Sequence, residues 1–393
     1  MAFFLLLGEI STASSARADR TTHPCLRHIT SGDALAVADP SGDIVFEKNA
    51  TEPFIPASIL KILTAATALH YLGPAYRFKT AFYTDKKGNL KVKGFGDPLF
   101  ISEIILEISD TLSKKLVDFK DLIIDTSYFA SGIHIPGQGM STNPYDAPVG
   151  ALCANFNTVC FHRTRTGKPV SSESQTPLTS LARRKIASLH LKKGRHVFTH
   201  NGHDAARYAG ELLLYFLSQK GVKNSGQIRF GRVTREDANV YTYHSRFTLE
   251  TALRKMLKFS NNFIANQIFI TVGARVYGAP GTLKKGIRAT RQYLEKTLSI
   301  NGVRITEGSG LSRENRLTAV DMLTILNHFK PYRYLLTEEN GLYYKTGTLS
   351  GIHTRAGYIQ ESGKAPCAFV ISLRGNGKKI TALMACIRRS RCP

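Results

Sequence analysis

A serine and a lysine stand three residues apart in the run PASILKILTAATALHYLG, which begins at Pro56. On a helix, Ser58 and Lys61 would share one face about 5–6 Å apart, so the hydroxyl and the amine could meet. The flanking residues are apolar on nearly every side, which predicts a buried helix. Burial disfavours the charged form of an amine, so Lys61 is expected to be neutral and to activate Ser58 as its base. Taken alone, the pair also fits a lysine that reaches the surface from a helix edge.

Two further motifs follow at long intervals. Ser58 is the only serine with a lysine three residues later, and Lys345-Thr346-Gly347 is the only K-T-G in the chain. The pattern S-x-N occurs more than once, but only Ser260-Asn261-Asn262 lies between the other two motifs and beside a long helical pattern. Together the three motifs predict one cleft that holds a nucleophile, a general base and a second cation.

These motifs resemble the S-x-x-K, S-x-N and K-T-G of the active-site serine penicillin-recognising enzymes. Longer phrases resemble the class C low-molecular-mass penicillin-binding proteins, which are serine D-alanyl-D-alanine carboxypeptidases and DD-endopeptidases: GDPLF, LIIDTSYFAS, NPYDAPVGAL, FSNNFIANQI, EGSGLSREN, YYKTGTLSG and RAGYI. The resemblance extends over nearly the whole chain after its leader. One departure is Glu307 in EGSG, where members of this group usually show Asp.

The resemblance implies a role for each catalytic residue. Ser58 would attack the carbonyl between the two terminal D-alanines of a stem peptide and form an acyl-enzyme, with Lys61 taking its proton. Backbone N–H groups of Ser58 and Thr348 would form the oxyanion hole. Ser260 would relay a proton toward the leaving amine, and Asn262 would hydrogen-bond the peptide amide.

It also implies a substrate-binding set. Lys345 would keep the cleft positive, the hydroxyls of Thr346 and Thr348 would bind the terminal carboxylate, and Gly347 would let the substrate backbone lie beside its strand. Asp125 in LIIDTS would meet the amino end of a diaminopimelate side chain; its alternative is an aspartate that caps a turn at a strand end. β-Lactam antibiotics are expected to acylate the same serine, and neither a cofactor nor a metal ion is implied.

The elements that must position these residues run in the order strand, helix, insertion, helices, strands, helix. We expect an α+β fold of the penicillin-binding/β-lactamase-like transpeptidase type: an antiparallel sheet with helices on both faces, a buried helical cluster, and an inserted, mainly β second domain. The interval between Ser58 and Ser260 is far longer than one helical connection needs, and this group carries an inserted domain there. The expected boundaries are residues 19–80 and 245–393 for the discontinuous DD-peptidase domain and residues 81–244 for the insertion.

Composition and charge narrow the class of protein. The chain has 393 residues, 42% hydrophobic, and a formal net charge of +24, which favours peripheral contact with an anionic wall polymer or membrane surface. A nucleic-acid partner is not expected, because the chain has no tryptophan, no binding motif and no patch where aromatic and basic residues interleave. The leader, residues 1–18, ends in an Ala-x-Ala pattern that resembles a signal-peptidase site.

The six cysteines show no C-x-x-C pair and no histidine at zinc-finger spacing, so a structural metal site is not expected. In an oxidising compartment they could form disulfides whose pairing the sequence leaves open. The pairs favoured first are Cys153 with Cys160, and two of Cys367, Cys386 and Cys392.

The sequence thus predicts an exported serine DD-peptidase of the periplasm or cell envelope, soluble or peripherally membrane-associated. It would hydrolyse D-Ala-D-Ala bonds and, as a second class of bond, D-Ala–diaminopimelate crosslinks. One alternative is a β-lactamase of the same fold, although the Glu-x-x-Leu-Asn segment of class A enzymes is missing. Another is a catalytically silent wall-binding protein, which would have no need of Ser58 beside a lysine.

Overall fold

The computed structural model describes residues 21–375 and 377–390, which divide into two compact units. The first unit comprises the chain up to Ala66, Arg291–Ile305 and the chain from Arg313 onward, and the second comprises Thr67–Thr290 and Thr306–Ser312. The leader expected at residues 1–18 lies outside the described residues. The domain boundaries expected from the sequence stay a prediction.

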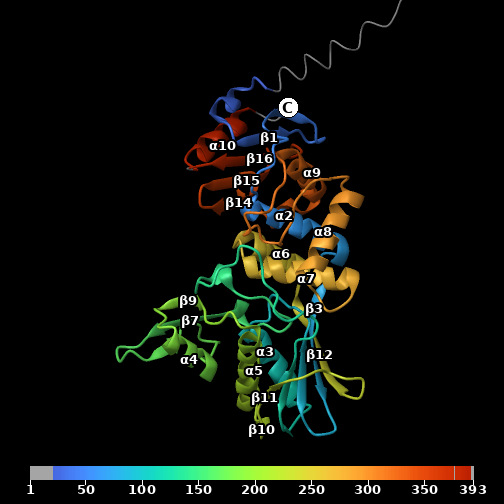
Figure 1. Ribbon diagram of the computed structural model, residues 1–393, viewed down its shortest axis with the longest axis vertical. Coiled ribbons are helices and arrows are strands. Elements are labelled where there is room, and N and C mark those ends of the chain that lie inside the picture. The colour runs from blue at the N-terminus through green and yellow to red at the C-terminus, as the bar shows by residue number, and fades with distance from the viewer. Residues whose placement is uncertain (1–20, 376, 391–393) are drawn as a thin grey trace, which may run out of the picture. The chain divides into compact units, whose positions relative to one another are not determined.

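A six-stranded antiparallel sheet forms the centre of the first unit (Figure 1). Residues 34–48 form a hairpin in this sheet. Its turn is held by the carboxylate of Asp39, which accepts hydrogen bonds from the backbone N–H groups of Ser41, Gly42 and Asp43. The last strand of the chain pairs with the first, so the sheet joins the two ends of the sequence. In sheet order the strands are β13 (Thr337–Glu339), β14 (Leu342–Leu349), β15 (Ile352–Ile359), β16 (Cys367–Arg374), β1 (Ala34–Ala38) and β2 (Ile44–Lys48).

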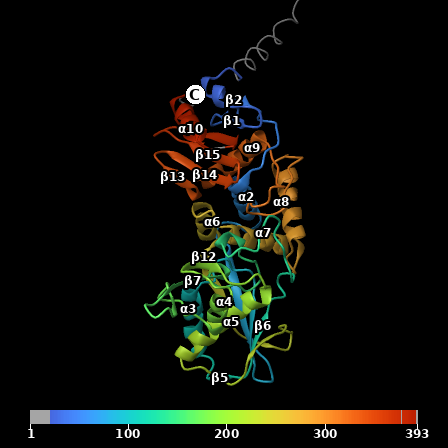
Figure 2. The ribbon, with the colours of Figure 1, turned by 60° about the vertical axis from the view of Figure 1, so that its left-hand side comes forward.

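Helices cover both faces of this sheet, because alternate residues of a strand point to opposite sides. The larger apolar residues Leu35, Val37 and Phe369 lie in one core with helix α10 (Lys379–Arg389) and the 3-10 helix η1 (Pro24–His28). Helix α9 (Ala319–Phe329) covers the other face, and the Tyr358 hydroxyl of β15 donates to the carbonyl of Leu326 on α9 at 2.5 Å. Figures 1 and 2 show α9 and α10 on opposite sides of the sheet. A 3-10 helix, η5 (Lys330–Leu335), follows α9.

A disulfide between Cys25 and Cys386 fastens η1 to α10. The expected pairing of Cys153 with Cys160 is wrong, since both thiols are free. Cys386 bonds to Cys25, while Cys367 is also disulfide-bonded, so the expected pairing of two of the last three cysteines stays a prediction for Cys367 with Cys392. Sequence proximity misled here: Cys153 is buried beside the Asn157 side chain, whose amide contacts its sulfur at 3.0 Å. Cys392 lies outside the described residues.

The insertion lies in the second unit and is built on a five-stranded sheet of mixed direction. Helices α3 (Ser102–Ser113) and α5 (Gly202–Gln219) pack on it in one hydrophobic core. At Gly210 on α5 a Cβ atom would lie 2.8 Å from a side-chain carbon of Ile124, so glycine permits the close approach. In sheet order the strands are β11 (Ile228–Phe230), β6 (Leu122–Asp125), β4 (Leu90–Gly94), β3 (Arg77–Thr84) and β12 (Ala238–Thr248).

A smaller three-stranded sheet, in the order β8-β7-β9, shares the same hydrophobic core through Val159 and Phe161 of β7, and Ile186 of α4 lies in that core too. The remaining elements of the insertion are β5 (Asp118–Phe119), β10 (Lys223–Asn224), β7 (Thr158–Arg163), β8 (Pro169–Ser171), β9 (Gly194–Val197), α4 (Ser180–Ser188) and the 3-10 turns η3 (Pro144–Asp146) and η4 (Asn155–Asn157).

Four further helices follow the order expected from the sequence. The long helical pattern after Phe247 is two helices, α6 (Leu249–Lys258) and α7 (Asn262–Tyr277), separated by a turn at Ser260. Helices α2 (Leu60–Leu72) and α8 (Leu283–Thr297) each have residues in both units. The antiparallel sheet with helices on both faces confirms the α+β class. None of the helices described is both long enough and apolar enough to cross a membrane.

We expect Cys25→Ser to lower the free energy of unfolding by about 2–5 kcal/mol, because the lost bond joins segments 361 residues apart. Calorimetric unfolding without reductant measures the loss. The control is Cys160→Ser, which removes a free, half-buried thiol and should change the free energy by no more than about 0.5 kcal/mol. Equal values for the two variants would contradict a stabilising role of the disulfide.

Candidate active site

Ser58 lies in a tight turn at the start of the apolar helix. The sequence led us to expect a helix from Pro56 onward, but the first turn, η2 (Ala57–Ile59), is a 3-10 helix, and the α-helix begins at Leu60. Ala57 adopts a left-handed backbone conformation with φ of +48°, which a residue with a Cβ rarely takes. Such strained residues occur preferentially at functional sites, where the surrounding structure holds them in place.

The side chains of Ser58 and Lys61 meet as their spacing predicts. Lys61 Nζ donates to Ser58 Oγ at 3.0 Å, and the lysine is 0% exposed. Its neighbours Ile59, Leu60 and Ile62 are fully buried as well. The alternative of a lysine that reaches the surface is therefore excluded. A distance of 3.0 Å lies within the range over which a proton passes between a base and a hydroxyl.

Strand β14 brings the K-T-G motif to the turn of Ser58. A Cβ on Gly347 would lie 2.8 Å from the backbone nitrogen of Ser58 and 2.3 Å from the Thr354 hydroxyl on β15, so only glycine fits. Thr354 in turn donates to the carbonyl of Pro56 at 2.7 Å. The sequence had not singled out Thr354; its only signal would have been its place opposite Gly347 once the strand register is known.

The other K-T-G residues divide between the two sides of β14. Lys345 is buried, whereas Thr346 and Thr348 are exposed. Lys345 Nζ donates to the carbonyl of Thr346 at 2.7 Å, and burial lowers the pKa of the Lys345 ammonium from 10.5 to about 8. The ammonium is thus largely charged at neutral pH, and the two hydroxyls are available to a ligand along the strand.

Ser260 and Asn262 lie in the turn between α6 and α7, in the second unit. Ser260 has a left-handed backbone with φ of +51°, and the side chain of Asn261 caps α7 by accepting a hydrogen bond from the N–H of Ile264 at 2.9 Å. Asn262 is the first residue of α7. The cap fixes where α7 begins and therefore where Asn262 stands. That Ser260 and Asn262 act in the same cleft as Ser58 and Lys61 stays a prediction.

Glu307, the departure noted in the sequence, organises the loop that follows it. Its buried carboxylate accepts hydrogen bonds from the backbone N–H groups of Ser309, Gly310 and Ser312 and from the side chain of Asn266 on α7. The Asn266 oxygen accepts a hydrogen bond from the N–H of Gly308 at 2.8 Å. Glu307 thus ties the loop 307–312 to the helix that begins with Asn262.

Asp125 ends strand β6 and lines a cleft of about 770 Å³ within the second unit. Its carboxylate is 0% exposed and lies 3.1 Å from the ammonium of Lys93. It also accepts hydrogen bonds from the N–H groups of Ser127 at 2.8 Å and Val233 at 2.9 Å. Burial raises the pKa of Asp125, but these hydrogen bonds outweigh it and hold the pKa below its usual value. The contacts are those of the turn-capping alternative, and a substrate amine would have to compete with Lys93.

The comparison with protein families matches one family over most of the chain. The model of the D-Ala-D-Ala carboxypeptidase 3 (S13) family matches residues 18–190 and 188–337. The chain is similar to the D-alanyl-D-alanine carboxypeptidase DacB of Haemophilus influenzae, with 24% identity over 415 residues that cover 84% of this chain and 83% of that protein. It is also similar to the D-alanyl-D-alanine carboxypeptidase of Actinomadura sp., with 25% identity over 411 residues that cover 86% of this chain and 76% of that protein.

Solved structures share the fold. Penicillin binding protein 4 (dacB) from Haemophilus influenzae superposes with a TM-score of 0.73 at 19% identity and covers 93% of this chain and 97% of that one. A predatory peptidoglycan endopeptidase from Bdellovibrio bacteriovorus, acylated by penicillin G, superposes with a TM-score of 0.53 at 15% identity, over 91% of this chain and 89% of that one. The fold agrees with that expected from the motifs, and the family model spans well over half of the residues. The chain belongs to the D-Ala-D-Ala carboxypeptidase 3 (S13) family.

Proposed function

We propose that the chain is a serine DD-peptidase that hydrolyses the D-Ala-D-Ala bond of peptidoglycan stem peptides through an acyl-enzyme on Ser58. The observation that carries this proposal is the 3.0 Å contact between Ser58 Oγ and the fully buried Lys61. In this mechanism Lys61 takes the hydroxyl proton as Ser58 attacks the carbonyl carbon, and D-alanine leaves with a proton on its nitrogen. Water then attacks the ester and releases the shortened peptide.

The close approach of β14 to the turn of Ser58 supports an oxyanion hole. The backbone N–H groups of Ser58 and Thr348 would donate to the oxygen that becomes negative in the tetrahedral intermediate. Gly347 lies against the Ser58 nitrogen, so the two donors belong to adjoining pieces of backbone. Removal of one such donor typically lowers the rate of acyl transfer by about 10²–10³-fold.

The terminal carboxylate of the substrate would bind along β14. The exposed hydroxyls of Thr346 and Thr348 would donate to it, and the nearby Lys345 ammonium would supply the positive charge. Ser260 would pass the proton to the leaving amine, and Asn262 would hydrogen-bond the peptide amide. These two roles rest on the S-x-N motif and on the capped start of α7.

A location outside the cytoplasmic membrane fits the chemistry of the chain. The Cys25–Cys386 disulfide is typical of an oxidising compartment, and the net charge of +24 favours peripheral contact with an anionic wall or membrane surface. Crosslinked D-Ala–diaminopimelate bonds present the same D-centred carbonyl, so we include them as a second class of substrate. β-Lactams are proposed as covalent inhibitors, in line with the penicillin G adduct of the Bdellovibrio enzyme.

Labelled benzylpenicillin tests the nucleophile and its base. The label should be found on Ser58 by peptide mass spectrometry, and Ser58→Ala should take up none. Lys61→Ala should acylate about 10²–10⁴-fold more slowly, the usual contribution of a general base, without a change in the unfolding temperature. Lys284→Ala, which removes an exposed lysine, is the matched control and should acylate at the normal rate. Label on another residue would overturn the proposal, and rapid multiple turnover of a cephalosporin would favour the β-lactamase alternative.

The pH dependence of substrate binding tests Lys345. Its pKa of about 8 means that the ammonium is present below pH 8 and is lost above it. The KM for a peptide ending in D-Ala-D-Ala should therefore rise about 10-fold or more between pH 7 and pH 10, as expected when a charged hydrogen bond is lost. Lys345→Arg keeps its charge over this range, so its KM should stay level. The same rise in both proteins would assign the effect to another group.

Asp125→Asn tests whether this carboxylate recognises a diaminopimelate amine. The variant should raise the KM for diaminopimelate-bearing peptides far more than the KM for a minimal D-Ala-D-Ala substrate. Only the diaminopimelate peptides carry an amine that would bind the Asp125 carboxylate. Lys93→Met is the companion variant, since it leaves Asp125 without its cation. Equal losses on both substrates, accompanied by a lower unfolding temperature, would show that Asp125 serves the fold alone.

A further inference from the structure

A second cleft of the second unit lies beside the S-x-N turn. None of the residues that line it has been given a catalytic or substrate-binding role above. It has a volume of about 530 Å³, within the range of small-ligand sites, and Asn261 forms part of its wall. We call it the Asn261 cleft. Its other walls come from the first turns of α3 and α7, from α6, and from the loops that precede β7 and α4. Every lining residue lies in the second unit.

One wall of the Asn261 cleft is apolar and aromatic. Phe259, at the end of α6, is 67% exposed, which is unusual for so large an apolar side chain. Phe247, Ile264 and Phe156 line the same space. Exposed aromatic groups gathered in a concave surface mark places where a ligand contacts a protein.

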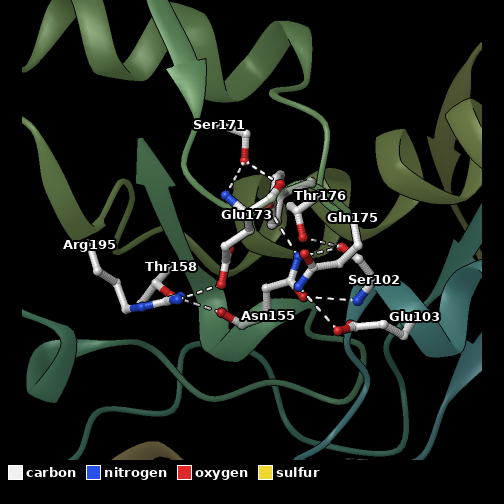
Figure 3. A network of polar contacts seen from close by, with 10 residues as sticks. Ser102, Glu103, Asn155, Thr158, Ser171, Glu173, Gln175, Thr176 and Arg195 are labelled. Carbon is white, nitrogen blue, oxygen red and sulfur yellow. Dashed lines mark hydrogen bonds and ion pairs between the residues drawn. The ribbon is translucent and has the colours of Figure 1, made fainter. Parts of the chain in front are cut away.

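The opposite wall is polar and rigidly held. Figure 3 shows Arg195 between Glu173 and Thr158, with an ion pair to the former and a 3.0 Å hydrogen bond to the latter. Asn155 is fastened to Ser102 by two hydrogen bonds of 2.9 Å. This wall is therefore fixed by internal bonds before any ligand arrives, which reduces the entropy that binding would remove.

Two lining residues carry opposite charges that the protein does not neutralise. Glu103 accepts a hydrogen bond on Oε1 from the Gln175 amide at 3.1 Å (Figure 3), and none of the residues that the structure describes donates to its Oε2. Lys255 is half-buried. Within residues 21–375 and 377–390, neither side chain has an ion-pair partner, and the two are too far apart to pair with each other. The cleft thus presents a free carboxylate oxygen and a free ammonium together.

The backbone beside the cleft is held in an unfavourable conformation. Asn155, Phe156 and Asn157 have consecutive left-handed φ angles of +49°, +59° and +52°. The Asn157 amide donates to the carbonyl of Pro148 at 2.7 Å, and the Asn155 bonds hold the other end of the turn. This arrangement places Phe156 in the cleft wall, and strain of this kind accumulates where a surface serves a ligand.

We propose that the Asn261 cleft binds a second peptidoglycan peptide, through an amino-acid end that carries both an ammonium and a carboxylate group. Glu103 would accept hydrogen bonds from the ammonium, Lys255 would pair with the carboxylate, and Phe259 would pack on the aliphatic carbons between them. The free end of a diaminopimelate side chain has this chemistry. The identity of the polymer rests on the proposed function, whereas the need for both charges rests on Glu103 and Lys255 alone.

A neutral sugar of the glycan strand is the less favoured occupant. It would use the aromatic wall but would leave both charges without partners in a partly desolvated cleft, which is unfavourable. A zwitterionic group satisfies both charges at once.

Calorimetric titration of the full chain carrying Ser58→Ala tests the proposal without any catalytic step. The probe is a stem tetrapeptide with a free diaminopimelate end and no D-Ala-D-Ala bond. We expect Glu103→Gln and Lys255→Gln each to weaken the dissociation constant about tenfold, since each removes a charge-assisted hydrogen bond. The matched controls are Glu236→Gln and Lys284→Gln, which remove exposed charges away from the cleft and should change binding less than twofold.

Chemically modified tetrapeptides test the same two contacts in the parent protein, so that this result does not depend on whether the variants fold. Acetylation of the diaminopimelate amine should weaken binding to the parent protein about as much as Glu103→Gln does, and should weaken it no further in that variant. Amidation of the neighbouring carboxylate should behave in the same way toward Lys255→Gln. The double-mutant logic thereby assigns each charge of the ligand to one residue of the cleft.

Three results would overturn the proposal. They are unchanged binding in both variants, binding of the acetylated and amidated probes to the parent protein as tight as that of the unmodified tetrapeptide, and stronger binding of a peptide-free glycan oligosaccharide than of the tetrapeptide. Labelled penicillin measured on the wild-type chain keeps the two proposals separate. Failure to acylate Ser58 would count against the peptidase mechanism, while the titration alone decides whether the cleft takes a zwitterionic peptide.

Discussion

The buried contact between Ser58 and Lys61 is the constraint around which β14, β15 and the turn of Ser58 are arranged in the first unit. An ammonium enclosed by apolar residues is unfavourable unless it is neutralised or hydrogen-bonded, so the serine hydroxyl at 3.0 Å is part of what makes the buried lysine tolerable. The same enclosure disfavours the charged form of the amine, and the proposed mechanism needs the neutral amine as its base. Two strands hold the turn that contains Ser58: Gly347 of β14 packs against it, and Thr354 of β15 donates a hydrogen bond to it.

The spacing of the motifs predicted this contact, because residues three apart on a helix must share a face. The α+β class and the order of elements also follow from local patterns. The 3-10 turn at Ser58 and the break at Ser260 could not be predicted, since both depend on left-handed residues other than glycine, which tertiary contacts must hold. The pairing expected for Cys153 and Cys160 was wrong, and the bond between Cys25 and Cys386 was missed, for a related reason: Cys25 and Cys386 meet only through the folded sheet and its helices.

The Asn261 cleft likewise depends on tertiary packing and could not be predicted from local sequence patterns. Nothing in the spacing of Glu103, Glu173 and Lys255 along the chain indicates that they line one cleft. Their placement depends on how α3, α6 and the loop before α4 pack in the second unit. Asp125 is the opposite case, because its place at the end of a strand was foreseen, whereas its enclosure by Lys93 and two backbone N–H groups became visible only in the fold.

The pairing of β1 with β16 has a consequence for how the chain acquires its structure during synthesis. The strand Ala34–Ala38 can pair with Cys367–Arg374 only after nearly the whole chain has been synthesised. Most of the second unit, in contrast, is one continuous stretch, Thr67–Thr290. Domains form as the chain emerges from its N-terminal end, and contacts between distant residues form late. The insertion can therefore become ordered while the turn of Ser58 still lies beside an incomplete sheet. A chain released before β14 would carry Ser58 and Lys61 and yet lack Gly347 and Thr354, which lie against the turn of Ser58.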